Sequence, residues 1–150
     1  MPCMKGVPAM TTFQISREIP ATPAAVFAAI ADPQRLARWW GPDGFRNSFE
    51  VCEFRPGGVW KFTMHGPDGA NYPNESVFFA IEPDRKVVID HACQPFFRLT
   101  VALEPSALGT RVHWTQVFAD AAVAAAVAHI VEPANEQNLS RLTAEVAAAS

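Results

Sequence analysis

Hydrophobic residues recur along this chain with two different periods. In the segment from Thr11 to Ile19, Phe13, Ile15 and Ile19 alternate with mostly polar neighbours. An alternation of period two is typical of a strand with one buried face. This first segment is therefore predicted to be a half-buried strand.

Two short helices are expected next. Thr22 and Asp32 are N-cap residues, and each is followed directly by a proline, which is favoured at the first helical position. The second helix is predicted to end near Trp39-Trp40, because Gly41-Pro42 follows. Adjacent helical residues point about 100° apart. We therefore expect only one of the two tryptophans to pack under the sheet, and the other to lie at a cavity mouth or on a contact surface.

Six further strands follow, separated by short turn segments. The strand segments read RNSFEVCEF, VWKFTMHG, ESVFFAIE, KVVIDHA, FFRLTVALE and TRVHWTQVF. Turns of hairpin length between such segments predict an antiparallel meander. The GPDG at residues 66–69 suits a hairpin turn, with proline in its second position.

The last segment is a long helix beginning after Asp120. Val127, Leu139, Leu142 and Val146 are among the apolar residues that mark one face of this helix. Pro133 predicts a kink or break near Val131, because proline cannot donate the helical hydrogen bond. The order is strand, two helices, six strands and a long helix, so the last helix is expected to cover the concave face of a bent sheet.

Composition narrows the class of protein. The chain has 150 residues, 49 % of them hydrophobic and 18 % charged, which suits one globular domain. The net charge of −3 and the absence of a basic stripe argue against nucleic-acid binding. No apolar run is long enough for a membrane span, and residues 1–10 resemble neither a signal peptide nor folded structure. We expect a flexible tail over 1–10, with Met1, Met4 and Met10 as alternative starts, and a single domain over 11–150.

Cysteine and histidine usage offers little for metal or nucleophile chemistry. Cys52 and Cys93 are far apart and without a neighbouring Cys, which suits buried thiols in a reducing cytoplasm. His65 and His113 share the outward parity of their strands, whereas His91 ends its strand and is ambiguous. We therefore expect no metal site, no cofactor and no legible catalytic residue.

Four motifs resemble a known family. They are WWGPDGF, RPGGVWKFTMHGPDGANY, IEPDRKVV and GTRVHWTQVF. Together they are similar to successive signatures of the activator of heat-shock protein ninety ATPase homologue-like family, a branch of the START/Bet v 1-like (SRPBCC) superfamily. The resemblance implies an α+β helix-grip fold, with a curved seven-stranded antiparallel sheet around the C-terminal helix and an apolar cavity between them. The family often has a Gly-Trp pair in this helix, where this chain has Ala134-Asn135.

Strand alternation and this fold together predict which residues line the cavity. The expected lining residues are Trp40, Trp60, Phe62, Met64, Tyr72, Asn74, Phe97, Leu99, Trp114, Gln116 and Phe118. Parity also places Ser76 beside Asn74. Aromatic residues are core formers by default, so filling of the interior by these side chains is the alternative.

Three functions fit these expectations. The first is binding of a small hydrophobic or aromatic molecule in the cavity. The second is a cyclase-, dehydratase- or hydrolase-type enzyme in the same pocket, using His91, Glu75 or Gln116. The third is a chaperone-related interaction domain linked to stress response, with an exposed Trp39 in the contact. Edge strands and an apolar helix face are also compatible with a homodimer.

Overall fold

A computed structural model of the protein describes residues 11–149. Its elements follow the predicted order. The sequence of elements is β1 (Thr12–Ile19), α1 (Pro23–Ala31), α2 (Pro33–Trp39), β2 (Arg46–Cys52), β3 (Val59–His65), β4 (Asn71–Glu82), β5 (Lys86–His91), β6 (Phe97–Pro105), β7 (Thr110–Phe118) and α3 (Ala121–Ala148). The tail expected over residues 1–10 lies outside the described residues.

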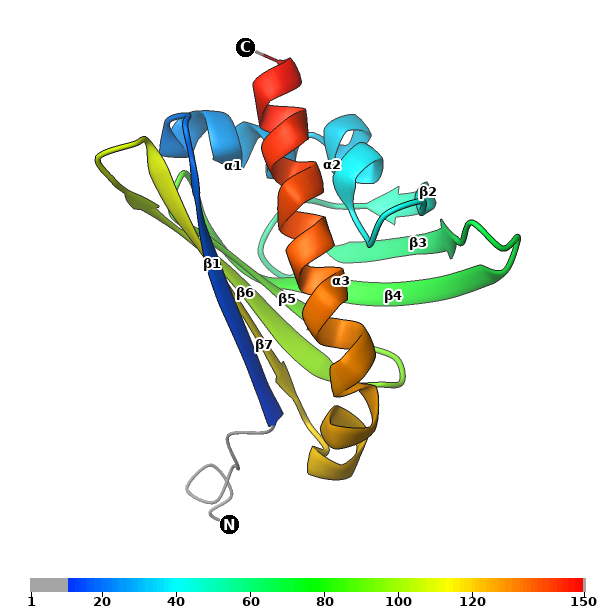
Figure 1. Ribbon diagram of the computed structural model, residues 1–150. Coiled ribbons are helices and arrows are strands. Elements are labelled where there is room, and N and C mark those ends of the chain that lie inside the picture. Colours follow the sequence, from blue (N-terminus) through cyan, green and yellow to red (C-terminus); the bar gives the residue numbers. More distant parts are fainter. Residues whose placement is uncertain (1–10, 150) are drawn as a thin grey trace.

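The strands form one antiparallel sheet of seven strands in the order β1-β7-β6-β5-β4-β3-β2. The sheet is strongly bent, and helix α3 runs across its concave side (Figure 1). Helices α1 and α2 close the end of the sheet beside the C-terminal part of α3 (Figure 1). This arrangement confirms the predicted α+β helix-grip fold.

The helix starts follow the predicted capping chemistry. The Thr22 hydroxyl accepts a hydrogen bond from the amide of Ala25 (3.1 Å), and the Asp32 carboxylate accepts one from Gln34 (3.0 Å). Asp120 does the same for the first turn of α3. Each cap satisfies an amide that has no carbonyl partner in its own helix, which fixes where the helix begins.

Two local features differ from what the sequence suggested. Helix α3 continues through Pro133 as one helix, so the predicted alternative of a break does not occur, although that residue cannot donate to the carbonyl of His129. Strand β4 begins at Asn71, earlier than the ESVFFAIE segment suggested, and includes Pro73. Around Pro73, β4 pairs only with β3, since pairing with β5 starts at Ser76, so the missing amide hydrogen costs no ladder bond there.

The core consists of a large cluster and a small one. The large cluster joins the concave face of the sheet to α1, α2 and the C-terminal half of α3, where Leu139 and Leu142 are fully buried. The small cluster contains Phe13, Phe118 and Ala124 and lies under the start of α3. Between these two clusters, α3 leaves part of the concave face of the sheet uncovered. The candidate site lies at this uncovered part.

Candidate functional site

A cavity of about 680 Å³ lies between the concave face of the sheet and the middle of α3. Strands β3 to β7, the segment after α2 and residues 130–138 of α3 contribute to its walls. Its apolar lining side chains are Trp40, Phe45, Phe62, Met64, Ile89, Phe97, Leu99, Trp114, Ile130, Val131 and Ala134. Its polar lining residues are Asn71, Tyr72, Asn74, Ser76, His91, Gln94, Gln116, Asn135 and Asn138. None of the lining residues within 11–149 is Asp, Glu, Lys or Arg.

All but two of the residues proposed from the sequence lie around this cavity. The residues at the wall are Trp40, Phe62, Met64, Tyr72, Asn74, Phe97, Leu99, Trp114 and Gln116. The two that lie elsewhere, Trp60 and Phe118, are on the predicted inner face but are covered by other side chains. Trp60 is stacked on Phe62 at 4.2 Å between ring centroids, and Phe118 packs edge-on against Phe13 in the small cluster.

The tryptophan pair Trp39-Trp40 divides, as expected, into one core residue and one partly buried residue at the cavity, and Trp39 is the core residue. Trp39 is 1 % exposed, and its indole donates to the carbonyl of Ala29 at 2.9 Å. Helix α2 ends at Trp39, and Trp40 adopts extended backbone angles, so the 100° rule no longer applies between them. Trp40 therefore also turns inward, packs against Trp60 and Trp114, and forms part of the cavity wall.

Polar contacts from α3 hold Trp40 and the following turn in place. The Arg141 guanidinium donates to five backbone carbonyls, those of Arg38, Trp40, Gly41, Pro42 and Phe45. The amide of Asn138 donates to the carbonyl of Trp39 and accepts from the amide of Gly41. Gly41 has a φ of +97°, and a Cβ there would lie 2.8 Å from the Met64 methyl group, so only glycine fits.

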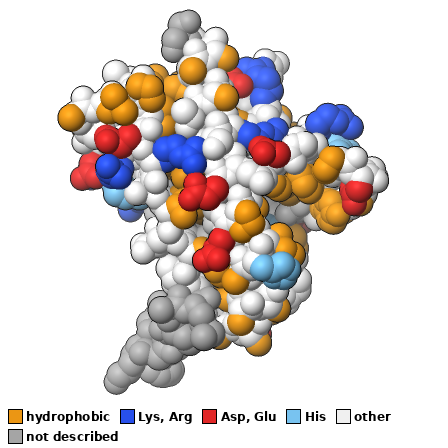
Figure 2. All heavy atoms as spheres, in the orientation of Figure 1, with side chains coloured by type: hydrophobic (Ala, Val, Ile, Leu, Met, Phe, Trp, Pro, Cys, Tyr) orange, Lys and Arg blue, Asp and Glu red, His pale blue; other side chains and the backbone are white. Residues whose placement is uncertain are grey.

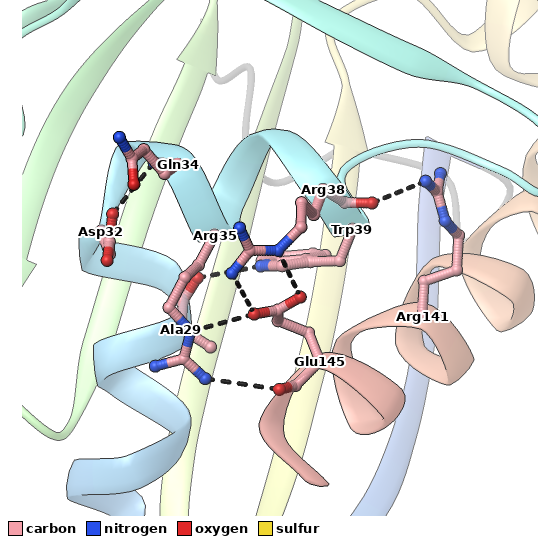
Figure 3. Close-up of polar contacts among 8 residues, drawn as sticks. All are labelled: Ala29, Asp32, Gln34, Arg35, Arg38, Trp39, Arg141 and Glu145. Atoms are coloured by element: carbon pink, nitrogen blue, oxygen red, sulfur yellow. Dashed lines mark hydrogen bonds and ion pairs between the residues drawn. The ribbon is translucent and has the colours of Figure 1, made fainter. Parts of the chain in front are cut away.

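A second set of contacts joins α2 to the same region of α3. The Glu145 carboxylate accepts hydrogen bonds from Arg35 (3.0 Å) and from Arg38 (2.8 and 3.0 Å), as Figure 3 shows. Hydrogen bonds from Arg38, followed by those from Arg35, lower the pKa of Glu145 despite its burial. This ion-pair cluster fixes the end of α2, and with it the position from which Trp40 enters the cavity.

One polar corner of the cavity is formed by His91, Asn74 and Ser76. His91 Nδ1 donates to the carbonyl of Pro95 at 2.7 Å, and Nε2 lies 2.7 Å from Asn74 Oδ1. The ring stacks on Phe97 with centroids 4.5 Å apart. Burial lowers the pKa of His91, and hydrogen bonds with the backbone of Pro95 and Cys93 partly oppose this shift. Ser76 is opposite His91 in the sheet and is 2 % exposed.

A second polar group, Gln116 with Asn135, faces the cavity from β7 and α3. Both residues are 8 % exposed, and the Asn135 amide nitrogen donates to Gln116 Oε1 at 3.1 Å. Gln116 Nε2 makes no hydrogen bond within the described part of the chain. Three side-chain atoms of the described residues are fully enclosed and have no hydrogen bond: Asn47 Oδ1, Trp60 Nε1 and Trp114 Nε1. Gln116 Nε2 is not among these enclosed atoms. The two N–H bonds of Gln116 Nε2 are therefore open to the cavity.

Other candidates for chemistry lie outside the cavity or are unsuited to metal binding. Within residues 11–149 no three His, Cys, Asp or Glu side chains are grouped closely enough to hold a metal ion. Glu75 is exposed and does not line the cavity. Burial raises the pKa of the Cys52 thiol to about 11, whereas Cys93 Sγ lies 3.5 Å from His91 Nε2, a neighbour that the sequence did not reveal.

The sequence-based site proposal missed the polar residues that α3 contributes. Asn135 precedes Leu139 by four positions, and Asn138 precedes Leu142 by four. Residues four apart share a helix face, so extending the apolar stripe toward the N-terminus would have placed both asparagines inside. Because both residues are polar, they were not counted as part of the buried face, although their spacing continues it.

Fold and site together define a helix-grip protein with a cavity under its long C-terminal helix. The family model for "Activator of Hsp90 ATPase homolog 1-like protein" matches residues 20–147. The chain therefore belongs to this family, within the START/Bet v 1-like superfamily, and the predicted resemblance is confirmed. A search of the curated proteins found no match.

Solved structures of several bacterial proteins share the fold. A protein from Nitrosomonas europaea superposes with a TM-score of 0.84 at 18 % identity, covering 93 % of this chain and 96 % of the other. A protein from Arthrobacter aurescens gives 0.83 at 27 % identity, covering 92 % and 87 %. The AHSA1 protein from Silicibacter pomeroyi gives 0.74 at 21 % identity, covering 93 % and 99 %. No helix within residues 11–149 is long and apolar enough to cross a membrane.

Proposed function

We propose that this protein binds a small, largely apolar molecule between the sheet and helix α3. The single observation that carries the proposal is the cavity of about 680 Å³, whose volume lies in the usual range for small-molecule sites. Its walls combine aromatic and aliphatic side chains with a few buried polar groups. That combination is the usual composition of a ligand pocket.

The contacts of His91 favour binding over catalysis. A general base needs a nitrogen free to take a proton from the substrate. His91 Nδ1 instead donates to the carbonyl of Pro95, and Asn74 Oδ1 lies 2.7 Å from Nε2, in the place that a substrate proton would need. Gln116 cannot serve as a base, and Glu75 lies outside the cavity. These contacts assign His91 a positioning role in the cavity wall.

The interaction-domain alternative depended on an exposed Trp39. That side chain is 1 % exposed and hydrogen-bonded inside the protein, so it offers no surface to a partner. We therefore place the function in the cavity.

Titration with an uncharged fluorescent probe, N-phenyl-naphthylamine, tests the proposal. We expect saturable enhancement of its fluorescence, with one site per chain. Ala134→Trp would place a large ring in the cavity and should abolish binding. Ala126→Trp adds the same ring to an exposed position of the same helix and should leave binding intact. Equal binding by both variants would show that the probe binds elsewhere, and absence of saturable binding to the parent protein would contradict the proposal.

A further inference from the structure

The cavity wall contains a buried side-chain amide whose nitrogen is oriented by the protein and has no hydrogen bond within the described residues. Asn135 holds the oxygen of the Gln116 side-chain amide, so the amide plane is fixed and Nε2 remains open. An amide nitrogen in such a place is normally paired, because an unsatisfied buried donor is costly. Gln116 is only 8 % exposed. A ligand atom is the natural partner for this donor.

The walls of the cavity also restrict the charge of that ligand. The lining residues within the described chain include no Asp, Glu, Lys or Arg. An ionised group taken from water into such a site would have no counter-charge, and burial of an unpaired charge is strongly unfavourable. The titratable lining groups are His91 and Tyr72, and the nitrogens of His91 are engaged by the protein. We therefore expect the site to disfavour carboxylate and ammonium groups.

We propose that the cavity selects uncharged ligands that carry a carbonyl group on an apolar body, with Gln116 Nε2 donating to the carbonyl oxygen and Asn135 as the positioning residue. This inference rests on the proposed function and adds a ligand class to it. The Ser76 hydroxyl and the Trp114 indole nitrogen are further buried polar groups of wall residues without a hydrogen bond in the described residues, but Trp114 Nε1 is fully enclosed, so only the Ser76 hydroxyl competes with Gln116 for a ligand. It rotates freely about its own bond, whereas the Gln116 amide is already held by Asn135 and is the better preorganised donor.

Three matched aromatic probes separate carbonyl recognition from apolar binding. Methyl β-naphthyl ketone carries the carbonyl, β-isopropenylnaphthalene replaces its oxygen with a CH₂ group of similar shape, and β-naphthoate replaces its methyl group with a charged oxygen. We expect the ketone to bind about tenfold more tightly than the alkene in isothermal titration calorimetry, as one neutral hydrogen bond allows. We expect β-naphthoate to show no measurable binding at neutral pH.

Substitution of Gln116 assigns the preference to a residue. Gln116→Met keeps the side-chain length and removes the donor, so the ketone and the alkene should bind the variant equally. Gln14→Met is the matched control, because Gln14 is an exposed residue of β1 outside the cavity. That variant should keep the tenfold preference.

The outcomes distinguish the two proposals. If ketone and alkene bind the parent protein equally, carbonyl selection is wrong while cavity binding stands. If neither these two probes nor N-phenyl-naphthylamine binds, the proposed function itself is wrong. If Ser76→Ala removes the ketone preference and Gln116→Met does not, the donor is Ser76 and the assignment to Gln116 is overturned. The parent ranking of the three probes decides the ligand class even if Gln116→Met does not fold.

Discussion

The two halves of helix α3 differ in burial and in their contacts with the rest of the protein. In the C-terminal half, Leu139 and Leu142 are fully buried, and Arg141 and Glu145 bind backbone and side chains of the α2 region. In the N-terminal half, Ile130 is 59 % exposed, and Ala124 is the only buried residue of α3 before Asn135 within the described chain. Figure 2 shows basic and acidic side chains next to one another on this face of the molecule, and Arg17 of β1 pairs with Glu136 of α3 at 2.8 Å. One half therefore anchors the fold, while the other half borders the cavity and is only lightly packed.

This difference indicates how a helix-grip protein can keep its fold while its cavity varies. The anchored half depends on buried apolar contacts and on hydrogen bonds that must be complete. The half at the cavity leaves its apolar side chains without full burial in the protein. Changes near residues 130–134 should alter the cavity at little cost in stability, whereas changes near residues 139–146 should unfold the protein.

Truncation of the anchored half should give the largest effect. Leu142→Ala removes a fully buried side chain from the large cluster, and such cavities cost about 2–5 kcal/mol of unfolding free energy. Val127→Ala shortens a half-buried residue in the other half of the helix and should cost about 1 kcal/mol or less. Urea unfolding followed by circular dichroism measures both. Equal losses in the two variants would contradict the division of the helix.

Loss of Arg141 should come next. Arg141→Met keeps much of the apolar stem but leaves five carbonyls of the α2–β2 segment without their donor. Unsatisfied carbonyls cost about 1–3 kcal/mol in total where water partly replaces the donor. Hydrogen exchange should increase selectively in residues 38–45. Arg111→Met is the control, since its ion pair with Glu18 is on the surface, and a similar loss of stability there would refute the anchoring role of Arg141.

The ion-pair cluster at Glu145 should make stability depend on pH. Because the pKa of Glu145 is lower in the folded than in the unfolded protein, its stabilisation is complete above the unfolded pKa and is lost as pH falls through the folded pKa. Glu145→Gln should therefore be less stable than the parent protein at neutral pH. The difference should begin to shrink as pH falls below about 4.3, the usual value for an unfolded glutamate, and should vanish only below the folded pKa of Glu145. Parallel stability curves for the two proteins between about pH 6 and pH 3 would rule out this linkage.

Local sequence patterns account for most of the fold but for less of the site. Period-two alternation, the Thr22 and Asp32 caps and the turn residues are local signals, and the structure follows them closely. The contacts that shape the cavity mouth are not local: Arg38 and Glu145, for example, are 107 positions apart in sequence. No single-sequence pattern pairs such residues, because only the folded helix brings them together.

The positions of Trp39 and Trp40 were also difficult to predict from local sequence patterns. Helical periodicity separated Trp39 from Trp40, but the helix ends between them, and helix ends are difficult to place to within one residue. The wall of the cavity was nevertheless largely predictable, because strand parity is preserved over each strand once its first residue is assigned. Trp60 and Phe118 have the predicted parity, yet neighbouring rings cover them, and parity alone says nothing about such coverage.

The smallest effect on stability should come from Ile130, which lines the cavity while 59 % exposed. Ile130→Ser should change the free energy of unfolding by no more than about 0.5 kcal/mol, because little apolar surface is buried there without a ligand. The same change should weaken binding of N-phenyl-naphthylamine severalfold, since the ligand would bury this side chain and gain its apolar contact. Ala125→Ser, on an exposed position of the same half of the helix, should alter neither property. If Ile130→Ser destabilised the protein by more than about 1 kcal/mol, the N-terminal half of α3 would be an anchor as well. If it left probe binding unchanged, the ligand would not contact this half of the helix and would be bound by the sheet side of the cavity alone.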